Sequence, residues 1–112
     1  MSDCLFCKIV DKSIPAKIVL ESDEWLAFED IDAKAPVHIL LIPKQHIADL
    51  HSVNTSGLFE SLMKGVSKVI THFNLQENGY RVVTNQGKDG GQAVFHLHFH
   101  IFGKRKMSWP PG

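Results

Sequence analysis

The chain has 112 residues with 12 basic and 12 acidic side chains, so its formal net charge is zero. This length supports one domain that buries roughly two-thirds of its unfolded surface. The balanced charge disfavours a role in coating nucleic acid, and no apolar stretch approaches the roughly 20 residues of a membrane span. The start of the chain lacks the basic residues and the long apolar run of a secretion signal, so we expect a cytoplasmic location.

Apolar periodicity predicts the secondary structure along the chain. Residues 5–10 are compatible with a short N-terminal helix, and apolar residues at helical spacing predict one long helix over 55–73. Five strands around one long helix, joined by short connections, argue for an α+β domain built on a five-stranded antiparallel sheet. The strands are predicted from runs of β-favouring residues over 17–21, 25–29, 37–42, 80–84 and 95–102.

Three histidines alternate with apolar residues near the end of the chain, at His96, His98 and His100. In a strand, successive side chains point to opposite faces. The three imidazoles would therefore share one face about 6.5 Å apart, and Leu97 and Phe99 would share the other. Such a row has three explanations: an accident of packing, a three-histidine metal site, or chemistry on an anion. Imidazole is neither the best core filler nor the most favourable surface residue, so the pattern favours chemistry on an anion.

The stretch 85–92 lies just before these histidines and contains three glycines. Glycine tolerates positive φ angles and lets backbone N–H groups approach a ligand closely. A loop of free amides beside a row of histidines therefore predicts a phosphate-binding cradle. The alternative is a plain hairpin loop, for which the Asp89-Gly90 pair is a common signal.

The sequence resembles the histidine triad family of nucleotide-binding hydrolases and transferases. The motif that carries the resemblance is His-x-His-x-His followed by Ile101-Phe102. Further matching stretches run in order through nearly the whole chain and resemble the HINT branch of the family, the purine nucleoside phosphoramidases. These stretches are Ile14-Pro15-Ala16-Lys17, Leu26-Ala27-Phe28, Asp30-Ile31, Ala35-Pro36-Val37-His38, Ile42-Pro43-Lys44, Gly79-Tyr80-Arg81, Asp89-Gly90-Gly91-Gln92 and Trp109-Pro110-Pro111-Gly112.

The resemblance implies a single domain over residues 1–112 that forms a homodimer with a continuous ten-stranded sheet. The C-terminal tail, residues 104–112, would reach toward the partner subunit. The implied activity is hydrolysis of purine nucleoside 5′-phosphoramidates, with aminoacyl adenylates as a second substrate class and AMP or GMP as the product. Catalysis would need no cofactor.

The same resemblance implies roles for the histidines. His98 attacks the α-phosphate and becomes nucleotidylated, and water then releases the nucleoside monophosphate. His100 donates to a phosphate or ribose oxygen, His38 fixes the protonation state and orientation of the triad, and His96 completes the catalytic set. Imidazole suits these roles because its pKa near 6.5 makes both protonation states accessible at neutral pH.

The resemblance also implies the nucleotide contacts. Backbone amides near Gly91, Gln92 and Ala93 would hold the non-bridging phosphate oxygens, and the Asn85 side chain would contact the phosphate or ribose. Asp30 would accept from the ribose hydroxyls, although it is also a typical turn residue. Ordinary core packing is the alternative for the residues placed around the purine. The apolar residues assigned to the nucleotide site are Phe6, Ile14, Phe28, Ile31 and Phe99.

One position departs from the family pattern. Many relatives carry serine where this chain has Ala93, and the serine hydroxyl reaches the scissile phosphate or the leaving group. Alanine keeps the backbone amide and loses that donor. The nucleophile is untouched, whereas the protonation of the leaving group, and hence the preference among amines, is in question.

Cys4 and Cys7 form a C-x-x-C pair near the start of the chain. A disulfide is disfavoured in the cytoplasm, which leaves redox chemistry, structural zinc, or two thiols without a function. By resemblance to several bacterial relatives and to the galactose-1-phosphate uridylyltransferases, His46 and His96 complete a Cys₂His₂ zinc set. Such a set is closed and tetrahedral, so the zinc would be structural and His96 would be a ligand rather than a free base.

Three other functions stay open at this point. A dinucleoside polyphosphate hydrolase is the enzymatic alternative, and the HINT-like C-terminus and stretch 89–92 argue against it. A nucleotide-binding adaptor with incidental catalysis would keep the same pocket. A three-histidine metalloenzyme would lose activity to chelators and regain it with metal.

Overall fold

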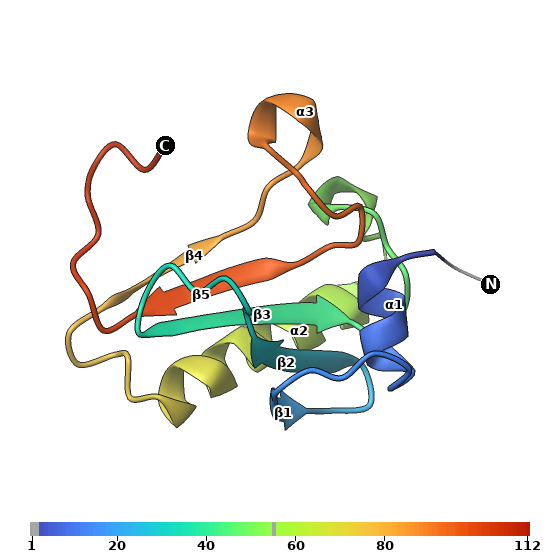
Figure 1. Cartoon of the computed structure of the whole chain (residues 1–112), viewed down its shortest axis with the longest axis horizontal. Helices are drawn as coiled ribbons and strands as arrows, with labels where there is room; N and C mark the ends of the chain where they lie inside the picture. Colours follow the sequence, from blue (N-terminus) through green and yellow to red (C-terminus); the bar gives the residue numbers. More distant parts are fainter. Residues whose placement is uncertain (1–2, 55) are drawn as a thin grey trace.

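A single antiparallel sheet organises the computed structural model, which describes residues 3–54 and 56–112 (Figure 1). The strands lie in the order β1-β2-β3-β5-β4, and every neighbouring pair is antiparallel. The predicted α+β class, with its five-stranded sheet, long helix and short N-terminal helix, is confirmed. In chain order the elements are α1 (Leu5–Val10), β1 (Ile18–Glu21), β2 (Trp25–Glu29), β3 (Val37–Pro43), the 3₁₀ helix η1 (Leu50–Ser52), α2 (Ser56–His72), β4 (Tyr80–Val83), α3 (Gly87–Gly90) and β5 (Phe99–Gly103).

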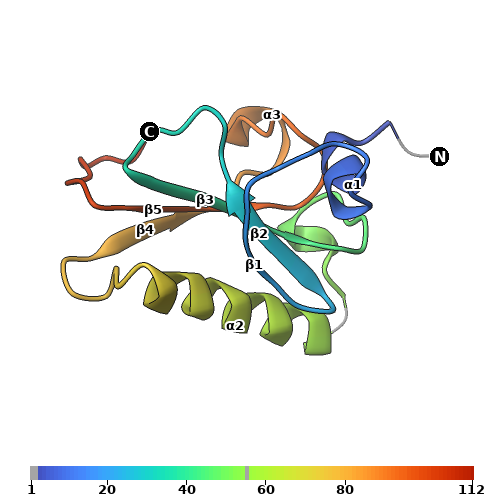
Figure 2. The ribbon, with the colours of Figure 1, turned by 60° about the horizontal axis from the view of Figure 1, so that its bottom comes forward.

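The sheet carries a hydrophobic core on each face because its strands alternate. Trp25 and Ala27 of β2 join the core under α2, and their neighbours Leu26 and Phe28 join a second core on the other side. Figure 2 shows α2 along one face of the sheet, with α1 and α3 on the opposite side. Strand β3 is buried along its whole length. Burial on both faces explains its nearly continuous apolar sequence.

Helix α2 closes the larger core with one apolar stripe. Leu58, Leu62, Val66 and Val69 are buried at intervals of three and four residues, which places them on one side of the helix. The observed helix matches the predicted one closely, and Thr55, where the predicted helix begins, lies outside the described residues. In the described parts of the chain, no helix has both the length and the apolar character needed to cross a membrane.

The end of α2 is a Schellman motif built on Asn74. This residue has a left-handed φ of 56°. The N–H of Leu75 donates to the carbonyl of Ile70 at 2.9 Å, and the N–H of Asn74 donates to the carbonyl of Thr71 at 3.0 Å. These bonds satisfy carbonyls that the helix would otherwise leave without a partner, so the chain turns toward β4 at this point.

The last strand begins later than the sequence predicts. The predicted range is 95–102, whereas β5 spans Phe99–Gly103 and leaves His96 and His98 in an irregular segment that begins with a bend. Neighbouring strands provide no ladder partners for that segment, because β3 pairs with β5 only as far as Phe99. The segment uses other partners instead: Leu97 N–H donates to the Ile47 carbonyl at 2.6 Å. The Thr84 hydroxyl donates to the His98 carbonyl at 2.9 Å.

Candidate functional site

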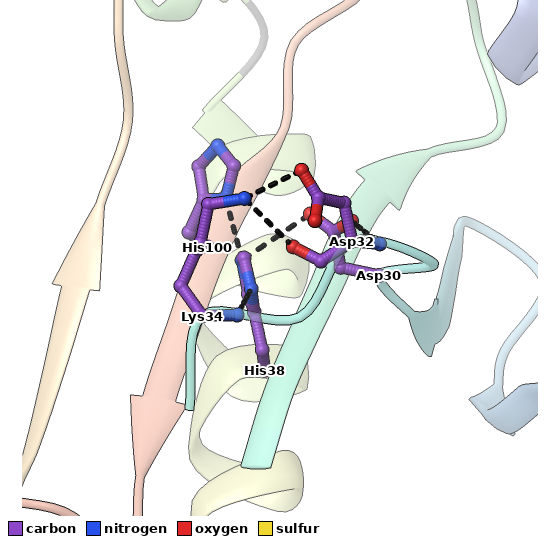
Figure 3. Close-up of polar contacts among 5 residues, drawn as sticks. All are labelled: Asp30, Asp32, Lys34, His38 and His100. Carbon is purple, nitrogen blue, oxygen red and sulfur yellow. Dashed lines mark hydrogen bonds and ion pairs between the residues drawn. The ribbon is translucent and has the colours of Figure 1, made fainter. Parts of the chain in front are cut away.

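His38 on β3 and His100 on β5 meet on the face of the sheet opposite α2 (Figure 3). The backbone N–H of Lys34 donates to Nδ1 of His38 at 3.0 Å, and because an amide only donates, this nitrogen carries no proton. Neutral His38 therefore holds its proton on Nε2, which lies 2.9 Å from Nδ1 of His100 and 3.3 Å from Oδ2 of Asp30. The turn between β2 and β3 thus sets the tautomer of His38.

The tautomer of His38 sets that of His100 in turn. Nε2–H of His38 donates to Nδ1 of His100, so neutral His100 holds its own proton on Nε2, where a ligand can receive it. Burial, helped by the neighbouring His98 and His38, lowers the pKa of His100 to about 4. Burial also lowers the pKa of His38, although the Asp30 carboxylate opposes that shift. His100 is therefore an uncharged hydrogen-bond donor at neutral pH.

The ring of His98 is the opposite tautomer, with its proton on Nδ1 rather than on Nε2. Its Nδ1 lies 2.8 Å from the carbonyl oxygen of His96, which only accepts, so Nδ1 carries the proton and Nε2 keeps a lone pair. His98 is only 6% exposed. In the described residues, every fully buried side-chain nitrogen has a hydrogen-bond partner. Nε2 of His98 has none among them, so this nitrogen reaches the surface. The ring centroids of His98 and His100 are 5.0 Å apart, which brings a nucleophilic lone pair close to a donor.

Three of the apolar residues assigned to the nucleotide site gather in the second core. Phe6 and Phe28 are buried with their ring centroids 5.7 Å apart, and Ile14 packs against the same core. Phe6 also contacts the ring of His98, with centroids 5.1 Å apart and ring planes at 83°. All three residues therefore belong to the second core or pack against it, and Phe6 also borders His98.

Phe99 departs from the predicted nucleotide site, whereas the assignment of Ile31 stays a prediction. Ile31 is fully exposed in the turn after β2. Phe99 is buried in the core under α2, because the alternation that turns His98 and His100 toward one face turns the residue between them toward the other. Contrary to the prediction, the Phe99 side chain is not available to a ligand on the histidine face.

The glycine-rich loop is more closed than the predicted phosphate cradle. The amides of Gly91 and Gln92 donate within the loop, to the carbonyls of Lys88 and Gly87 at 3.1 and 3.0 Å. The Gln92 side chain is buried and bonds three backbone groups, which fixes the shape of the loop. Among the described residues, no acceptor is bound to the amide of Ala93. The predicted cradle is thus reduced to the Ala93 amide.

A cleft of about 460 Å³ opens beside His100. The C-terminal tail lies along it: Arg105 Nε donates to the Lys34 carbonyl at 2.7 Å, and Arg81 Nη2 donates to the Ser108 carbonyl at 2.9 Å. The tail therefore contacts its own chain, and its reach toward a partner stays a prediction. His98 is not among the lining residues, which include Asp30, His38, Asn85, Phe102, Met107 and Pro111.

The structure brings the four predicted zinc ligands together. Sγ of Cys4 lies 3.4 Å from Nδ1 of His96, and Sγ of Cys7 lies 3.2 and 3.6 Å from Nδ1 of His46 and His96. In a tetrahedral site, Zn–S and Zn–N bonds of about 2.3 and 2.05 Å put sulfur and nitrogen about 3.6 Å apart. His96 donates through Nε2 to the Pro43 carbonyl at 2.8 Å, so its Nδ1 faces the sulfurs without a proton. This cluster fits a tetrahedral metal ion.

A second group of ligand atoms, from Asp30, His38 and His100, is equally compact but fits a metal poorly. The amide of Lys34 occupies Nδ1 of His38 and leaves the proton on Nε2, the atom that would have to bind the ion. Metal binding there would require an imidazolate or the loss of the Lys34 bond. This arrangement argues against a metal ion at Asp30, His38 and His100.

The family model of the HIT domain matches residues 11–107 of the chain. The chain belongs to the HIT domain family. A HIT family hydrolase from Legionella pneumophila has the same fold, with a TM-score of 0.94 and 46% identity over 98% of this chain and 100% of that one. An uncharacterized HIT-like protein of Synechococcus elongatus is 47% identical over 98% of this chain and 97% of its own length. A 14 kDa zinc-binding protein of Brassica juncea is 40% identical over 98% of this chain and all of its own.

Several residues that shape the site of this HIT domain are not singled out by the sequence. Lys34 and the carbonyl of His96 act through the backbone, which every residue possesses. Thr84 acts through its hydroxyl, and a polar residue at the end of the predicted strand 80–84 is the signal that could have found it. Arg105 bonds the turn between β2 and β3, a contact between parts of the chain that are distant in the sequence.

Proposed function

We propose that this HIT domain hydrolyses purine nucleoside 5′-phosphoramidates through a covalent nucleotidyl-His98 intermediate. The observation that carries the proposal is the opposite polarity of two neighbouring rings: His98 offers a lone pair, and His100 offers a proton. The likeness to a HIT family hydrolase supports hydrolysis in general. Nucleophilic catalysis by imidazole divides one difficult displacement at phosphorus into two easier ones.

The hydrogen bonds of the site suggest how each half of the reaction proceeds. Nε2 of His98 forms a bond to phosphorus while the bond from phosphorus to the amine nitrogen breaks. The His96 carbonyl stabilises the resulting imidazolium through Nδ1–H, and Nε2–H of His100 donates to a phosphoryl oxygen. Water then attacks phosphorus and the bond to His98 breaks, which releases AMP or GMP. The departing amine takes a proton from solvent in the first half, and the attacking water returns a proton to solvent in the second, so that one water is consumed over the cycle.

The nucleotide would lie between the second core and the glycine-rich loop. Phe6 borders His98, and Ile14 and Phe28 pack in the same core as Phe6, where the three would form an apolar wall for a purine. Asp30 would receive the ribose hydroxyls while it keeps its contact with His38. The amide of Ala93 would hold a non-bridging oxygen, and Asn85, which lines the cleft, would contact the phosphate or ribose.

The test is to trap the intermediate. The chain is mixed with adenosine phosphoramidate, quenched early, and digested for mass spectrometry. We expect an AMP adduct on His98 that disappears in His98→Ala and persists in His51→Ala, which removes an exposed histidine outside the site. A folded wild-type chain that binds AMP without an adduct and without accelerating cleavage would contradict the enzyme and support the adaptor.

We further propose that Cys4, Cys7, His46 and His96 hold a structural zinc ion. The spacing of their ligand atoms and the deprotonated Nδ1 of His96 support this assignment. The Brassica juncea relative is named as a zinc-binding protein, which agrees with it. A closed set of four protein ligands leaves no open position for substrate, so the ion would hold structure rather than perform chemistry.

We also propose that the chain forms a homodimer. Strand β4 is an edge of the sheet, and its Tyr80 and Val82 are exposed. An edge strand with exposed apolar side chains is prone to pair with another strand, and α2 adds the exposed Phe59. Sedimentation velocity should give twice the chain mass, and a Val82→Lys variant should shift the chain toward the monomer.

A further inference from the structure

Helix α1 joins the metal-ligand cluster to the reactive histidine. Cys4 and Cys7 contribute sulfurs to the cluster, and Phe6 lies between them in the sequence. The Phe6 ring is 4% exposed, and its centroid lies 5.8 Å from that of His96 and 5.1 Å from that of His98. Both pairs are nearly perpendicular, at 75° and 83°. Whatever holds the two cysteines therefore also holds Phe6 against the His98 ring.

His96 provides a second connection between the cluster and His98. Its Nδ1 faces both sulfurs, and its Nε2 donates to the Pro43 carbonyl. Its backbone carbonyl accepts from Nδ1 of His98. A metal ion that fixes the His96 side chain therefore also limits the movement of the carbonyl that sets the His98 tautomer.

We propose that Phe6 is a positioning residue for His98, and that the cluster of Cys4, Cys7, His46 and His96 holds Phe6 in place when it binds a divalent metal such as zinc. The catalytic role of His98 in this inference rests on the proposed function. The coupling between the cluster and the orientation of the His98 ring does not depend on that function. The hydrogen bond from Nδ1 is one restraint on the imidazole, which can still turn about its Cβ–Cγ bond. A perpendicular aromatic ring in contact blocks that rotation and keeps the Nε2 lone pair directed outward.

The first experiment separates Phe6 from the general packing of the second core. Phe6→Leu and Phe28→Leu remove similar volumes from the same core, but of these two phenylalanines only Phe6 has a ring contact with His98 among the described residues. Both variants should weaken nucleotide binding. Phe6→Leu should slow the formation of the His98 adduct at saturating substrate about three- to tenfold more than Phe28→Leu does.

The second readout is the tautomer of His98, followed through the ¹⁵N signals of its ring at fixed pH without substrate. We expect the Nδ1-protonated form to dominate in the wild type and in Phe28→Leu, and a mixture of tautomers in Phe6→Leu with its zinc content unchanged. This readout does not depend on catalysis. Absence of an adduct in the wild type would overturn the proposed function, whereas an unchanged His98 tautomer in Phe6→Leu would overturn the positioning role.

The third experiment tests the metal without changing the core. His46 is the exposed ligand of the cluster, so His46→Gln should fold, lose zinc, and produce the same mixed His98 signals as Phe6→Leu. His51→Gln, which changes an exposed histidine outside the cluster, should retain the zinc and the wild-type signals. Zinc loss in His46→Gln with unchanged His98 signals would overturn the coupling.

Discussion

Nε2 of His38 lies 2.9 Å from Nδ1 of His100, and this contact determines which nitrogen of His100 faces a ligand as a donor. We expect His38→Leu to lower the rate of phosphoramidate cleavage about three- to tenfold, with a smaller effect on KM, because His100 loses its preferred tautomer. Steady-state kinetics measures both constants. Lys34→Ala is the control, since it keeps the backbone amide that bonds His38. An equal loss in the two variants would contradict this role for His38.

Acid should destabilise the fold through His100. Its pKa is about 4 in the folded chain, below the ordinary value of 6.5, so the unfolded chain takes up a proton first as the pH falls. The stabilisation is complete above pH 6.5 and is lost as the pH falls toward 4, at no more than about 1.4 kcal/mol per pH unit for one histidine. Urea unfolding between pH 7 and 5 measures the slope. His100→Asn should show a shallower slope than the wild type. A slope equal to that of the wild type would contradict His100 as the source of the pH dependence.

Removal of metal should destabilise the chain, because the cluster ties the N-terminal helix to the loop after β3 and to the segment before β5. We expect one zinc ion per chain by elemental analysis and a lower Tm after treatment with a chelator. Each kcal/mol lost lowers the Tm of a domain of this size by about 4 °C or more. Zinc should restore the Tm and magnesium should not, because magnesium prefers oxygen ligands. A chain purified without metal and insensitive to chelators would contradict the zinc site.

Ala93→Ser should change the choice of leaving group. The amide of Ala93 lies in the loop before the histidines, where a serine would add a hydroxyl beside the proposed phosphate position. Alkylamines leave poorly without a proton, so their phosphoramidates should be cleaved about tenfold faster by the variant, within the range typical of general acid catalysis. Substrates with aniline leaving groups should gain less. Equal gains for both amine classes, measured as kcat/KM, would argue against a role in leaving-group protonation.

The contact between α2 and the sheet should depend on the small size of Gly65. A Cβ atom at this position would lie 2.7 Å from Cε2 of Trp25, so Gly65→Ala should destabilise the chain by about 1 to 3 kcal/mol. Gly57 lies in the same helix, and a methyl group added there would have no neighbour within 4 Å, so Gly57→Ala should stabilise the chain by about 0.5 kcal/mol. Denaturant unfolding compares the two, and effects of the same sign would contradict this account of the packing.

Much of the fold is predictable from the sequence because alternation and helical spacing record which side of an element is buried. Strand β2 has the predicted bounds, and α2 ends at His72, one residue before its predicted end. The predicted start of β5 was wrong because pairing with β3 stops at Phe99, although β3 continues to Pro43, and Leu97 bonds the loop residue Ile47 instead. Helix α3 was missed because it is only one turn long and is held by Gln92, which bonds the loop from outside the turn.

The candidate site was predictable in its residue types but not in its protonation. Alternation and family resemblance pointed to His38, His98 and His100, and the structure brings their rings together. The polarity of each ring depends on backbone groups, namely the amide of Lys34 and the carbonyl of His96. These groups are present at almost every position of any chain, so only the folded geometry shows which of them is used.

The main chain of Lys34 is held from both directions: its N–H binds the His38 ring, and the carbonyl of the same residue receives the guanidinium of Arg105. The C-terminal tail therefore contacts the residue whose amide sets the tautomers of His38 and His100. A protease cut before Arg105 would remove one of the two hydrogen bonds that hold the main chain of Lys34. Its effect would reach His38 and His100 in the middle of the sheet as well as the cut end.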